Sequence, residues 1–347
     1  MPPPDANIQA NIQAAAPLFE LRDVSKQFIK PLPLSARLAH YFGAKGQAET
    51  VHAVDHVTLS IAAGEVLGLV GESGCGKSTL ARLAAGLHVL SQGQRWWQGE
   101  RLDTLGTAQR RRKQLGIQMI FQDPSASLNP RMRVQDIIGE APLAHGMVES
   151  RQQAQYVADL LQQVGLDAGA LRRYPHQFSG GQRARIGIGR ALAVNPQLLI
   201  CDEAVAALDV SIQAQVINLF MDLREARRLT YLFISHDLGV VRHIADRVVV
   251  MYLGRVVESA PTEELFTRPN HPYTLALLAS APTLAVKKMA FFPLKGEIPS
   301  PLHPPSGCHF HPRCPHAMAR CKVARPALQE ISPGHLSACL LNDTVKQ

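Results

Sequence analysis

The stretch "GESGCGKS" at residues 71–78, followed directly by "TLARLAAG", is a glycine-rich turn that runs into a helical pattern. It matches the phosphate-loop pattern G-x-x-x-x-G-K-[ST] in full, and the apolar run "VLGLV" before it supplies the expected strand. Backbone N–H groups of such a loop and the positive end of the helix dipole bind phosphate oxygens. Glycines are needed there because a Cβ would block the close approach. The stretch therefore predicts a nucleotide site on an α/β fold.

Three side chains of this loop carry most of its chemistry. We expect Lys77 to neutralise the β and γ phosphates of a bound nucleotide, and Ser78 to offer its hydroxyl to magnesium. Cys75, at a variable position of the loop, is either a small filler residue or a thiolate activated by Lys77. The filler is the simpler interpretation.

An acidic pair and two further polar residues follow apolar runs that predict strands. "QLLICDE" ends at Asp202 and Glu203, which places both carboxylates at the carboxyl end of a parallel sheet, where such folds bind ligands. Asp202 suits a supporting role near magnesium, and Glu203 suits a general base that activates the attacking water. His236 in "FISHD" and Gln122 in "MIFQDP" follow other strands at the same edge. His236 could donate a hydrogen bond to the γ-phosphate, and Gln122 could reach magnesium or the water.

A second helix start of the same kind lies in "FSGGQRARIGIGRAL", residues 178–192. Ser179 as N-cap and Gln182 three residues later form a capping box, while Gly180 and Gly181 leave bare amides at the helix start. This is a second anion-binding helix N-terminus about 100 residues after the first. Because the chain already has its own phosphate loop, the pattern suggests a phosphate held between two molecules.

Composition narrows the class of protein. The chain has 347 residues, 46% of them hydrophobic, and a formal net charge of +8, which favours anionic partners. Aromatic residues make up only 5%, which argues against a stacking platform for single-stranded nucleic acid. The N-terminal "MPPPDANIQANIQAAAP" has no secretory-signal pattern, and no apolar run is long enough to span a membrane. We expect a cytosolic protein.

The pattern along the chain predicts one nucleotide-binding core with an added C-terminal part. Residues 1–16 are expected to form a flexible leader, and a Pro-rich insertion interrupts the first strands up to about residue 50. Residues 123–195 have a helical pattern, typical of an inserted subdomain. The apolar runs "QLLI", "TYLFIS" and "RVVVMY" predict strands of a parallel sheet. Beyond Pro269 the chain is rich in Pro and His.

Four cysteines near the C-terminus point to a metal, because cytosolic thiols seldom form structural disulfides. Their spacing is C-x5-C-x6-C-x17-C, beginning in "GCHFHPRCPHAMARC", and the residues are Cys308, Cys314, Cys321 and Cys339. Thiolates suit both zinc and iron–sulfur centres, and the spacing matches neither the C-x2-C zinc pair nor the common ferredoxin pattern. Zinc remains an alternative, because three neighbouring histidines could also serve as ligands: His309, His311 and His316. Unmetallated thiols are the third alternative.

Taken in order, these motifs resemble those of the ATP-binding subunits of ABC transporters, whose signature "LSGGQ" differs here only in Phe178. The resemblance implies an α/β P-loop NTPase core with an inserted helical subdomain and a small Cys-rich C-terminal appendix. The corresponding domains are residues 17–266 and 267–347. It also implies that two subunits pack head to tail, with each ATP between one phosphate loop and the signature of the other subunit.

The resemblance assigns roles residue by residue. Catalysis is assigned to Lys77, Glu203 and His236. ATP binding within one chain is assigned to Phe28, Gly71, Ser73, Gly74, Cys75, Gly76, Lys77, Ser78, Thr79, Gln122 and Asp202, with Ser78 and Gln122 on magnesium. Contact with the ATP bound by the partner subunit is assigned to Ser179, Gly180, Gly181, Gln182 and Asp209. Ala206 stands where the family usually has serine, so we expect hydrolysis with altered coupling between the sites.

A narrower resemblance lies in "YPHQFSGGQR", "HPYTLALLASAP" and "GEIPSPLHPPSGCHFHPRC". These stretches are similar to the ATPases of dipeptide and oligopeptide importers, most closely to the second ATPase subunit of dipeptide permeases. This implies a location at the cytoplasmic face of the bacterial inner membrane. The implied partners are a homologous ATPase subunit, two transmembrane permease subunits and, indirectly, an extracytoplasmic substrate-binding protein. It also implies a 4Fe-4S cluster on the four cysteines.

The alternative is a non-transport ABC ATPase that acts on nucleic acid or ribosomes, which would use the basic charge. Such proteins usually carry two ATPase cores in one chain or a long coiled-coil insertion. The sequence has neither, so an importer is the preferred interpretation and no nucleic-acid partner is expected.

Overall fold

The computed structural model describes residues 16–30, 49–280 and 296–344. Most of the predicted leader, and the Pro-rich insertion over residues 31–48, lie outside the described residues. The chain divides into two compact units. The first comprises residues 1–20, 60–68 and 96–246, and the second comprises residues 21–59, 69–95 and 247–347.

Parallel strands form the centre of the first unit. They are β6 (Ile117–Ile120), β7 (Leu198–Asp202) and β8 (Thr230–Ile234), and β7 pairs with both neighbours. All residues of β7 and β8 are buried, in keeping with the continuous apolar runs of the sequence. The last registered pair of β7 and β8 is Asp202 with Ile234, so the residues that follow both strands emerge at one edge.

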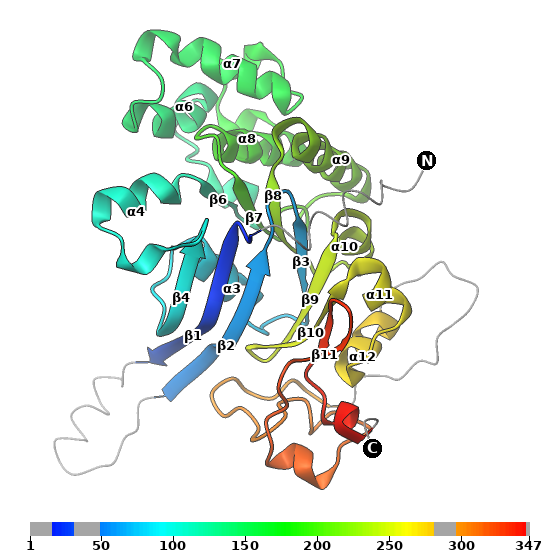
Figure 1. The fold of residues 1–347 in the computed structure, drawn as a ribbon. Helices are drawn as coiled ribbons and strands as arrows, with labels where there is room; N and C mark the ends of the chain where they lie inside the picture. Colours follow the sequence, from blue (N-terminus) through cyan, green and yellow to red (C-terminus); the bar gives the residue numbers. More distant parts are fainter. Residues whose placement is uncertain (1–15, 31–48, 281–295, 345–347) are drawn as a thin grey trace, which may run out of the picture. The chain divides into compact units, whose positions relative to one another are not determined.

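Helices account for most of the remaining first unit. They are α4 (Thr107–Gln114), α5 (Pro124–Ser127), α6 (Val134–Ala144), α7 (Gln153–Gln163), α8 (Gly180–Leu192), α9 (Val210–Arg227) and α10 (Leu238–Ile244). Short 3-10 turns are η1 (Leu102–Thr104), η2 (Ser150–Gln152), η3 (Ala168–Arg172) and η4 (Pro175–Gln177). Helices α6, α7 and α8 lie side by side and contact one another (Figure 1). Helix α7 buries an apolar stripe at Val157, Leu160 and Leu161, which Val164 extends just past the end of the helix.

The second unit is built mainly of antiparallel strands. β1 (Phe19–Lys30) lies between β2 (Glu49–Ile61) and β4 (Gln92–Trp97). The end of β4, at Trp96 and Trp97, pairs with β5 (Glu100–Arg101), and this short hairpin belongs to the first unit. A second group runs in the order β9 (Arg247–Tyr252), β10 (Arg255–Pro261), β12 (His335–Ser337) and β11 (Gln329–Ser332). Its helices are α3 (Lys77–Ala84), α11 (Thr262–Thr267) and α12 (Pro272–Ser280), with turns η5 (Ala319–Lys322) and η6 (Leu340–Thr344). The chain passes from the first unit to the second within β3 (Val66–Val70).

The hairpin of β9 and β10 was not anticipated from the sequence, which predicts only a parallel-sheet strand for "RVVVMY". The two strands pair antiparallel through a two-residue turn at Leu253 and Gly254. Both turn residues have positive φ, 43° and 81° respectively. Two consecutive positive φ values match the twist of a tight hairpin, which accounts for the reversal of the chain.

A buried carboxylate fixes the C-terminal strands to β10. Glu258 in β10 is 0% exposed, and its carboxylate accepts hydrogen bonds from the backbone N–H groups of Asn270 and His271 at 2.7 and 2.9 Å. His335 in β12 lies with Nε2 2.7 Å from the same carboxylate, and its Nδ1 lies 3.7 Å from a carboxylate oxygen of Glu264. A buried charge held by three donors stabilises the fold as long as each donor stays in place.

The ionisation of this pair sets a pH window for stability. Burial raises the pKa of Glu258, but its hydrogen bonds outweigh burial, so the pKa lies below the ordinary 4.5. Burial lowers the pKa of His335, but Glu258 and Glu264 outweigh it, so the pKa lies above 6.5. Burial lowers the pKa of the adjacent His271 to about 4, so this side chain stays neutral through most of the window. The stabilisation is complete between the two ordinary values, and is lost as pH falls through the pKa of Glu258 or rises through that of His335.

We therefore expect His335→Gln to lower the melting temperature more at pH about 5.5 than at pH about 8.5. At the lower pH the variant loses a charged partner of a buried carboxylate, a change worth about 3 kcal/mol. Thermal unfolding followed by circular dichroism at both pH values measures the effect. His243→Gln is the control, because His243 is exposed on α10. An equal loss at both pH values would show that charge on His335 does not contribute.

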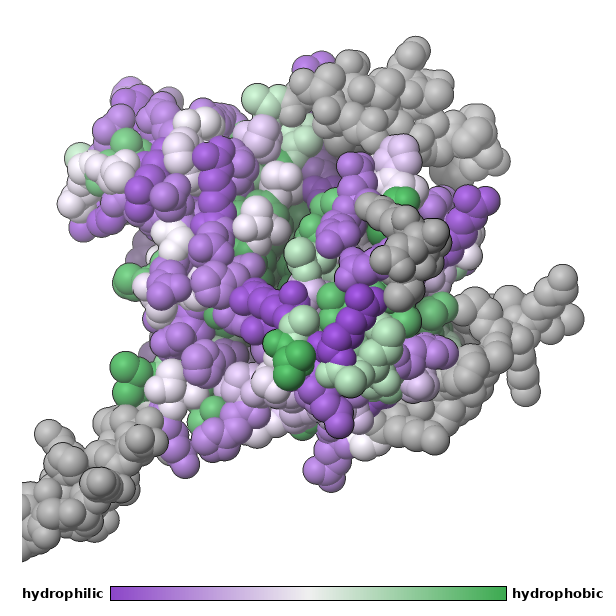
Figure 2. Space-filling view, turned by 60° about the horizontal axis from the view of Figure 1, so that its bottom comes forward, coloured by the Kyte–Doolittle hydropathy of each residue, from purple (hydrophilic) through white to green (hydrophobic). Residues whose placement is uncertain are grey.

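Hydrophilic residues make up most of the surface on one face of the molecule (Figure 2). Hydrophobic residues occur singly or in small groups among hydrophilic ones on the face shown in Figure 2. Among the described residues, no helix is both long and apolar enough to cross a membrane.

Candidate functional site

The phosphate loop lies between β3 and α3, as the sequence predicts. Two of its glycines are held against other backbone segments. A Cβ on Gly71, which has φ of 153°, would lie 2.2 Å from the carbonyl oxygen of Met251. A Cβ on Gly76, which has φ of 108°, would lie 2.2 Å from the carbonyl oxygen of Ala53. The close packing thus requires glycine at both positions.

Lys77 begins α3 and folds back over the loop. Its Nζ donates hydrogen bonds to the carbonyl oxygens of Gly71 at 2.8 Å and Glu72 at 3.0 Å. Cys75 is 2% exposed, and burial raises the pKa of its thiol. A buried, protonated thiol supports the interpretation of Cys75 as a filler residue.

Residues from far along the chain hold the loop in place, and sequence reasoning missed them. Tyr273 accepts a hydrogen bond through its hydroxyl from the N–H of Glu72 at 2.8 Å. The N–H of Gly254 donates to the carbonyl oxygen of Cys75 at 2.8 Å. Arg313 donates to both carboxylate oxygens of Glu72, at 2.7 and 3.0 Å. The spacing of these residues in the sequence gives no local signal for the contacts.

The acidic edge of the first unit brings together three of the predicted residues. Glu203 follows β7, and its Oε2 accepts a hydrogen bond from Gln122 Nε2 at 2.7 Å. His236 Nδ1 lies 3.7 Å from the same oxygen. Glu203 has a positive φ of 49°, which is uncommon for a residue with a side chain. Asp202, the last residue of β7, is 2% exposed.

The signature segment starts α8 with the capping box that the sequence predicts. Ser179 Oγ accepts from the N–H of Gln182 at 3.3 Å, and Gln182 Oε1 accepts from the N–H of Ser179 at 3.1 Å. Ser179 and Gly180 are exposed, so their polar groups are open to a ligand from outside this chain. Gly181 is buried, and a Cβ there would lie 2.4 Å from Ile212. Phe178 is 5% exposed, so the difference from the usual leucine concerns a core position.

Two further predicted residues lie on exposed surface. Phe28 on β1 is 37% exposed, with its ring edge-to-face to His88 at 5.6 Å between centroids and Lys26 Nζ 5.0 Å from its centroid. Asp209 precedes α9 and is exposed, as is Ala206.

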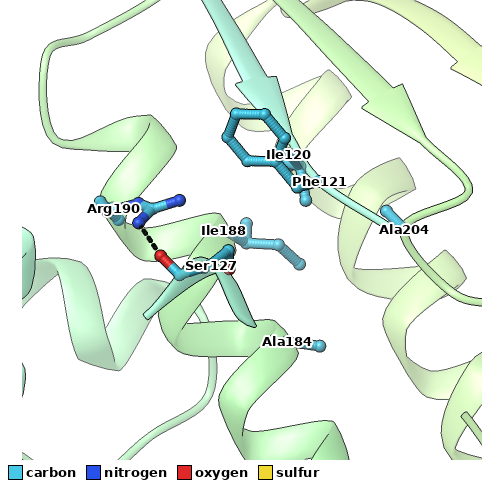
Figure 3. A pocket seen from close by; sticks show the side chains of 8 residues that line it. Ile120, Phe121, Ser127, Ala184, Ile188, Arg190 and Ala204 are labelled. Carbon is cyan, nitrogen blue, oxygen red and sulfur yellow. Dashed lines mark hydrogen bonds between the residues drawn. The ribbon is translucent and has the colours of Figure 1, made fainter. Parts of the chain in front are cut away.

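A small pocket links the segment after Gln122 to α8. It is lined by Ile120, Phe121, Ser127, Ala184, Gly187, Ile188, Arg190 and Ala204 (Figure 3). Arg190 donates a hydrogen bond to the carbonyl oxygen of Ser127 across it, and burial lowers the pKa of this guanidinium. The pocket has a volume of about 10 Å³, room for a single water, so it is not a nucleotide site.

All four C-terminal cysteines line one narrow pocket. The lining comprises His271, Pro272, Cys308, Phe310, His311, Cys314, His316, Cys321, Cys339, Leu340 and Leu341. Burial raises the pKa of Cys308, Cys314 and Cys339, the last to about 11. Over the described residues, no three His, Cys, Asp or Glu side chains lie close enough together to hold a metal ion. The fold gathers the thiols around one space without forming a coordination site.

Comparison with known proteins agrees with these motifs. The family model described as "ABC transporter" matches residues 54–206, and "Oligopeptide/dipeptide transporter, C-terminal region" matches residues 257–321. The oligopeptide transport ATP-binding protein AppF of Bacillus subtilis is 50% identical, over 93% of this chain and 97% of that protein. The putative oligopeptide transport ATP-binding protein YkfD of the same species is 49% identical, over 90% of this chain and 95% of that protein.

Solved structures share the fold at lower identity. A dimeric ATP-binding cassette bound to ADP and phosphate has a TM-score of 0.59 at 24% identity, covering 70% of this chain and 98% of that one. The cbiO1 protein of Clostridium perfringens, part of an ABC transporter complex, also has a TM-score of 0.59 at 24% identity, covering 73% of this chain and 91% of that one.

The phosphate loop, the signature and the acidic strand end therefore define an ABC-type ATPase. More narrowly, the chain belongs to the family of ATP-binding subunits of oligopeptide and dipeptide ABC transporters.

Proposed function

We propose that the chain couples ATP binding and hydrolysis to the uptake of dipeptides or oligopeptides through a membrane importer. The observation that carries this proposal is the 50% identity with an oligopeptide transport subunit over nearly the whole of both chains. The match includes the C-terminal region that is specific to oligopeptide and dipeptide transporters. No observation favours the alternative of an ATPase acting on nucleic acid or ribosomes.

Within one ATP site, the proposal assigns each predicted residue a task. Backbone N–H groups of residues 71–79 bind the phosphates, and Lys77 neutralises their charge. Ser78 and Gln122 would supply oxygen ligands that suit magnesium, with Asp202 in a supporting role; the ion would neutralise charge on the phosphates. Phe28 stacks on the adenine.

Hydrolysis in this proposal depends on Glu203. The carboxylate of Glu203 accepts the proton of the attacking water. Gln122 orients this carboxylate through the hydrogen bond at 2.7 Å. His236 lies beside the same oxygen and is 60% exposed, which leaves it open to donate a hydrogen bond to the γ-phosphate. The water has to lie between the carboxylate and the phosphorus, on the open side of the strand ends.

A second, homologous ATPase subunit completes the proposed assembly. Ser179, Gly180 and Asp209 are exposed, which suits contact with the ATP of a partner, together with Gly181 and Gln182. Solved cassettes with the same fold form dimers. We further propose domains at 17–266 and 267–347, with a helical subdomain at about 123–195. The pair docks on two transmembrane permease subunits at the cytoplasmic face of the bacterial inner membrane. An extracytoplasmic substrate-binding protein delivers cargo to the permease subunits and is therefore only an indirect partner of the ATPases.

The importer proposal is tested by reconstitution. The chain, its partner ATPase and the permease subunits are purified together and placed in lipid vesicles with the binding protein. Uptake of labelled di- or oligopeptide should depend on ATP and should stop when Lys77→Ala replaces the unaltered chain. Co-purification with RNA or ribosomes in place of membrane subunits would contradict the proposal.

For the C-terminal thiols we propose a 4Fe-4S cluster, with zinc as the alternative. Support comes from the chemistry of the four donors, which suits iron–sulfur centres, and from their position around one pocket. Cys308, Cys314, Cys321 and Cys339 would have to move inward to bind it. A bound cluster would hold together a segment with little apolar core of its own.

Anaerobic purification should give a coloured protein with iron and sulfide in equal amounts. Cys314→Ser is expected to lose both, whereas Cys201→Ala is expected to keep them, because Cys201 is buried in β7 outside this group. Absorbance spectra with iron, sulfide and zinc analysis make the measurement. A colourless protein with one zinc per chain would contradict the iron–sulfur cluster and support zinc as the bound metal.

A further inference from the structure

The phosphate loop carries a negative charge of its own. Glu72 is the second residue of "GESGCGKS", and its side chain is 20% exposed. A bound triphosphate brings several negative charges to the same loop, and like charges at short range oppose binding. An ATP-binding loop with this carboxylate needs a partner that neutralises it.

Arg313 supplies that partner from the C-terminal region, 241 positions later in the chain. Its guanidinium donates two hydrogen bonds to the two carboxylate oxygens, at 2.7 and 3.0 Å, a bidentate arrangement that fixes orientation as well as charge. The side chain of Arg313 is 5% exposed, so water screens this ion pair poorly. Both residues belong to the second unit, as does the loop itself.

The segment around Arg313 is itself firmly held. Phe310 is 2% exposed and its ring contacts Tyr252 and Tyr273, with centroids 5.3 and 5.4 Å away. The N–H of Arg313 donates to the carbonyl oxygen of Phe310 at 3.0 Å. Tyr273 also accepts from the N–H of Glu72, so the aromatic cluster and Arg313 hold the same loop residue by its backbone and its side chain.

We propose that Arg313 is a positioning residue for ATP binding, which neutralises Glu72 and holds the phosphate loop in the shape that accepts the triphosphate. The C-terminal region thereby sets the affinity of the loop for ATP. This inference rests on ATP binding at the loop. It differs from a purely structural ion pair, which would fasten the C-terminal region to the core and leave nucleotide affinity unchanged.

The test compares Arg313→Gln, Glu72→Gln and the double variant in the full chain. Arg313→Gln is expected to raise the Kd and the KM for ATP about tenfold, the scale of one poorly screened charge near a bound phosphate, with little change in kcat. Glu72→Gln removes the charge that needs neutralising and should bind ATP at least as tightly as the unaltered chain. The double variant should recover most of the loss. Equilibrium titration with a fluorescent ATP analogue and steady-state kinetics provide the readouts.

Arg320→Gln is the matched control, since Arg320 pairs with Asp343 and the carbonyl oxygen of Leu340 within the C-terminal region. It should leave the Kd unchanged. A double variant that binds as weakly as Arg313→Gln, or an Arg313→Gln variant with unchanged Kd, would overturn the proposal. If Arg313→Gln does not fold, Arg313→Lys takes its place. It keeps the positive charge but loses the bidentate contact with Glu72, so the Kd is expected to rise a few-fold, and an unchanged Kd would overturn the proposal. Failure of the unaltered chain to bind ATP would instead overturn the function on which the inference rests.

Discussion

Glu203→Gln is expected to bind ATP with nearly unchanged affinity and to hydrolyse it about 10²- to 10⁴-fold more slowly. Glutamine has the shape of glutamate, so the side-chain amide can still lie beside Gln122 and His236. It cannot accept a proton from water, and the attacking hydroxide equivalent is no longer generated. Because hydrolysis opens the proposed dimer, the variant should also accumulate as an ATP-bound dimer.

Two measurements check this result. Phosphate release gives the rate, and size-exclusion chromatography with and without ATP gives the oligomeric state. Glu225→Gln is the matched control, because Glu225 is exposed on α9. This variant should hydrolyse ATP at the normal rate. Normal steady-state hydrolysis by Glu203→Gln would remove this residue from the mechanism.

Gly76→Ala is expected to weaken ATP binding by more than about 100-fold. The new Cβ would lie 2.2 Å from the carbonyl oxygen of Ala53, which is backbone and cannot rotate away, and the φ of 108° is strained for any residue with a side chain. The loop must therefore shift, and the N–H groups that bind phosphate move with it. Strain of about 3 kcal/mol or more at this point corresponds to the loss in affinity.

Gly74→Ala in the same loop is the control for this prediction. Gly74 also has a positive φ, 78°, but no atom lies within 4 Å of a Cβ built there. Its substitution costs only backbone strain of about 1 to 2 kcal/mol, so we expect roughly a tenfold loss of affinity. Nucleotide titration, with circular dichroism to show that both variants fold, separates the two. Equal losses would mean that contact with Ala53 does not shape the loop.

Local sequence patterns predicted the features that depend on neighbours in the chain. The phosphate loop, the capping box of Ser179 and Gln182, and the carboxyl-end position of Asp202 and Glu203 follow from spacing within a few residues. The structure also places Gln122 and His236 beside Glu203. Because the carboxyl ends of parallel strands lie at one edge of a sheet, the sequence was enough to predict that these three side chains lie close together. It did not predict which of them form hydrogen bonds with one another.

Contacts between distant segments were not accessible in the same way. The pair of Glu72 and Arg313 depends on how the C-terminal region packs. A single acidic residue at a variable loop position gives no pattern from which its partner could be predicted. The hairpin turn at Leu253 was missed because leucine seldom takes positive φ, so residue type gave no turn signal. For the four cysteines, spacing indicated a shared site and the fold places them around one pocket, while the nature of the bound group stays a proposal.

The bidentate contact between Glu72 and Arg313 has a consequence for anyone who builds chimaeras of these ATPases. A core that keeps Glu72 but receives a foreign C-terminal region without a matching arginine would inherit an uncompensated carboxylate in its phosphate loop. A foreign core that receives this C-terminal region would gain a buried guanidinium with no acceptor. We therefore expect a simple exchange at the proposed boundary near residue 267 to fail unless the two residues are transferred, or replaced, together.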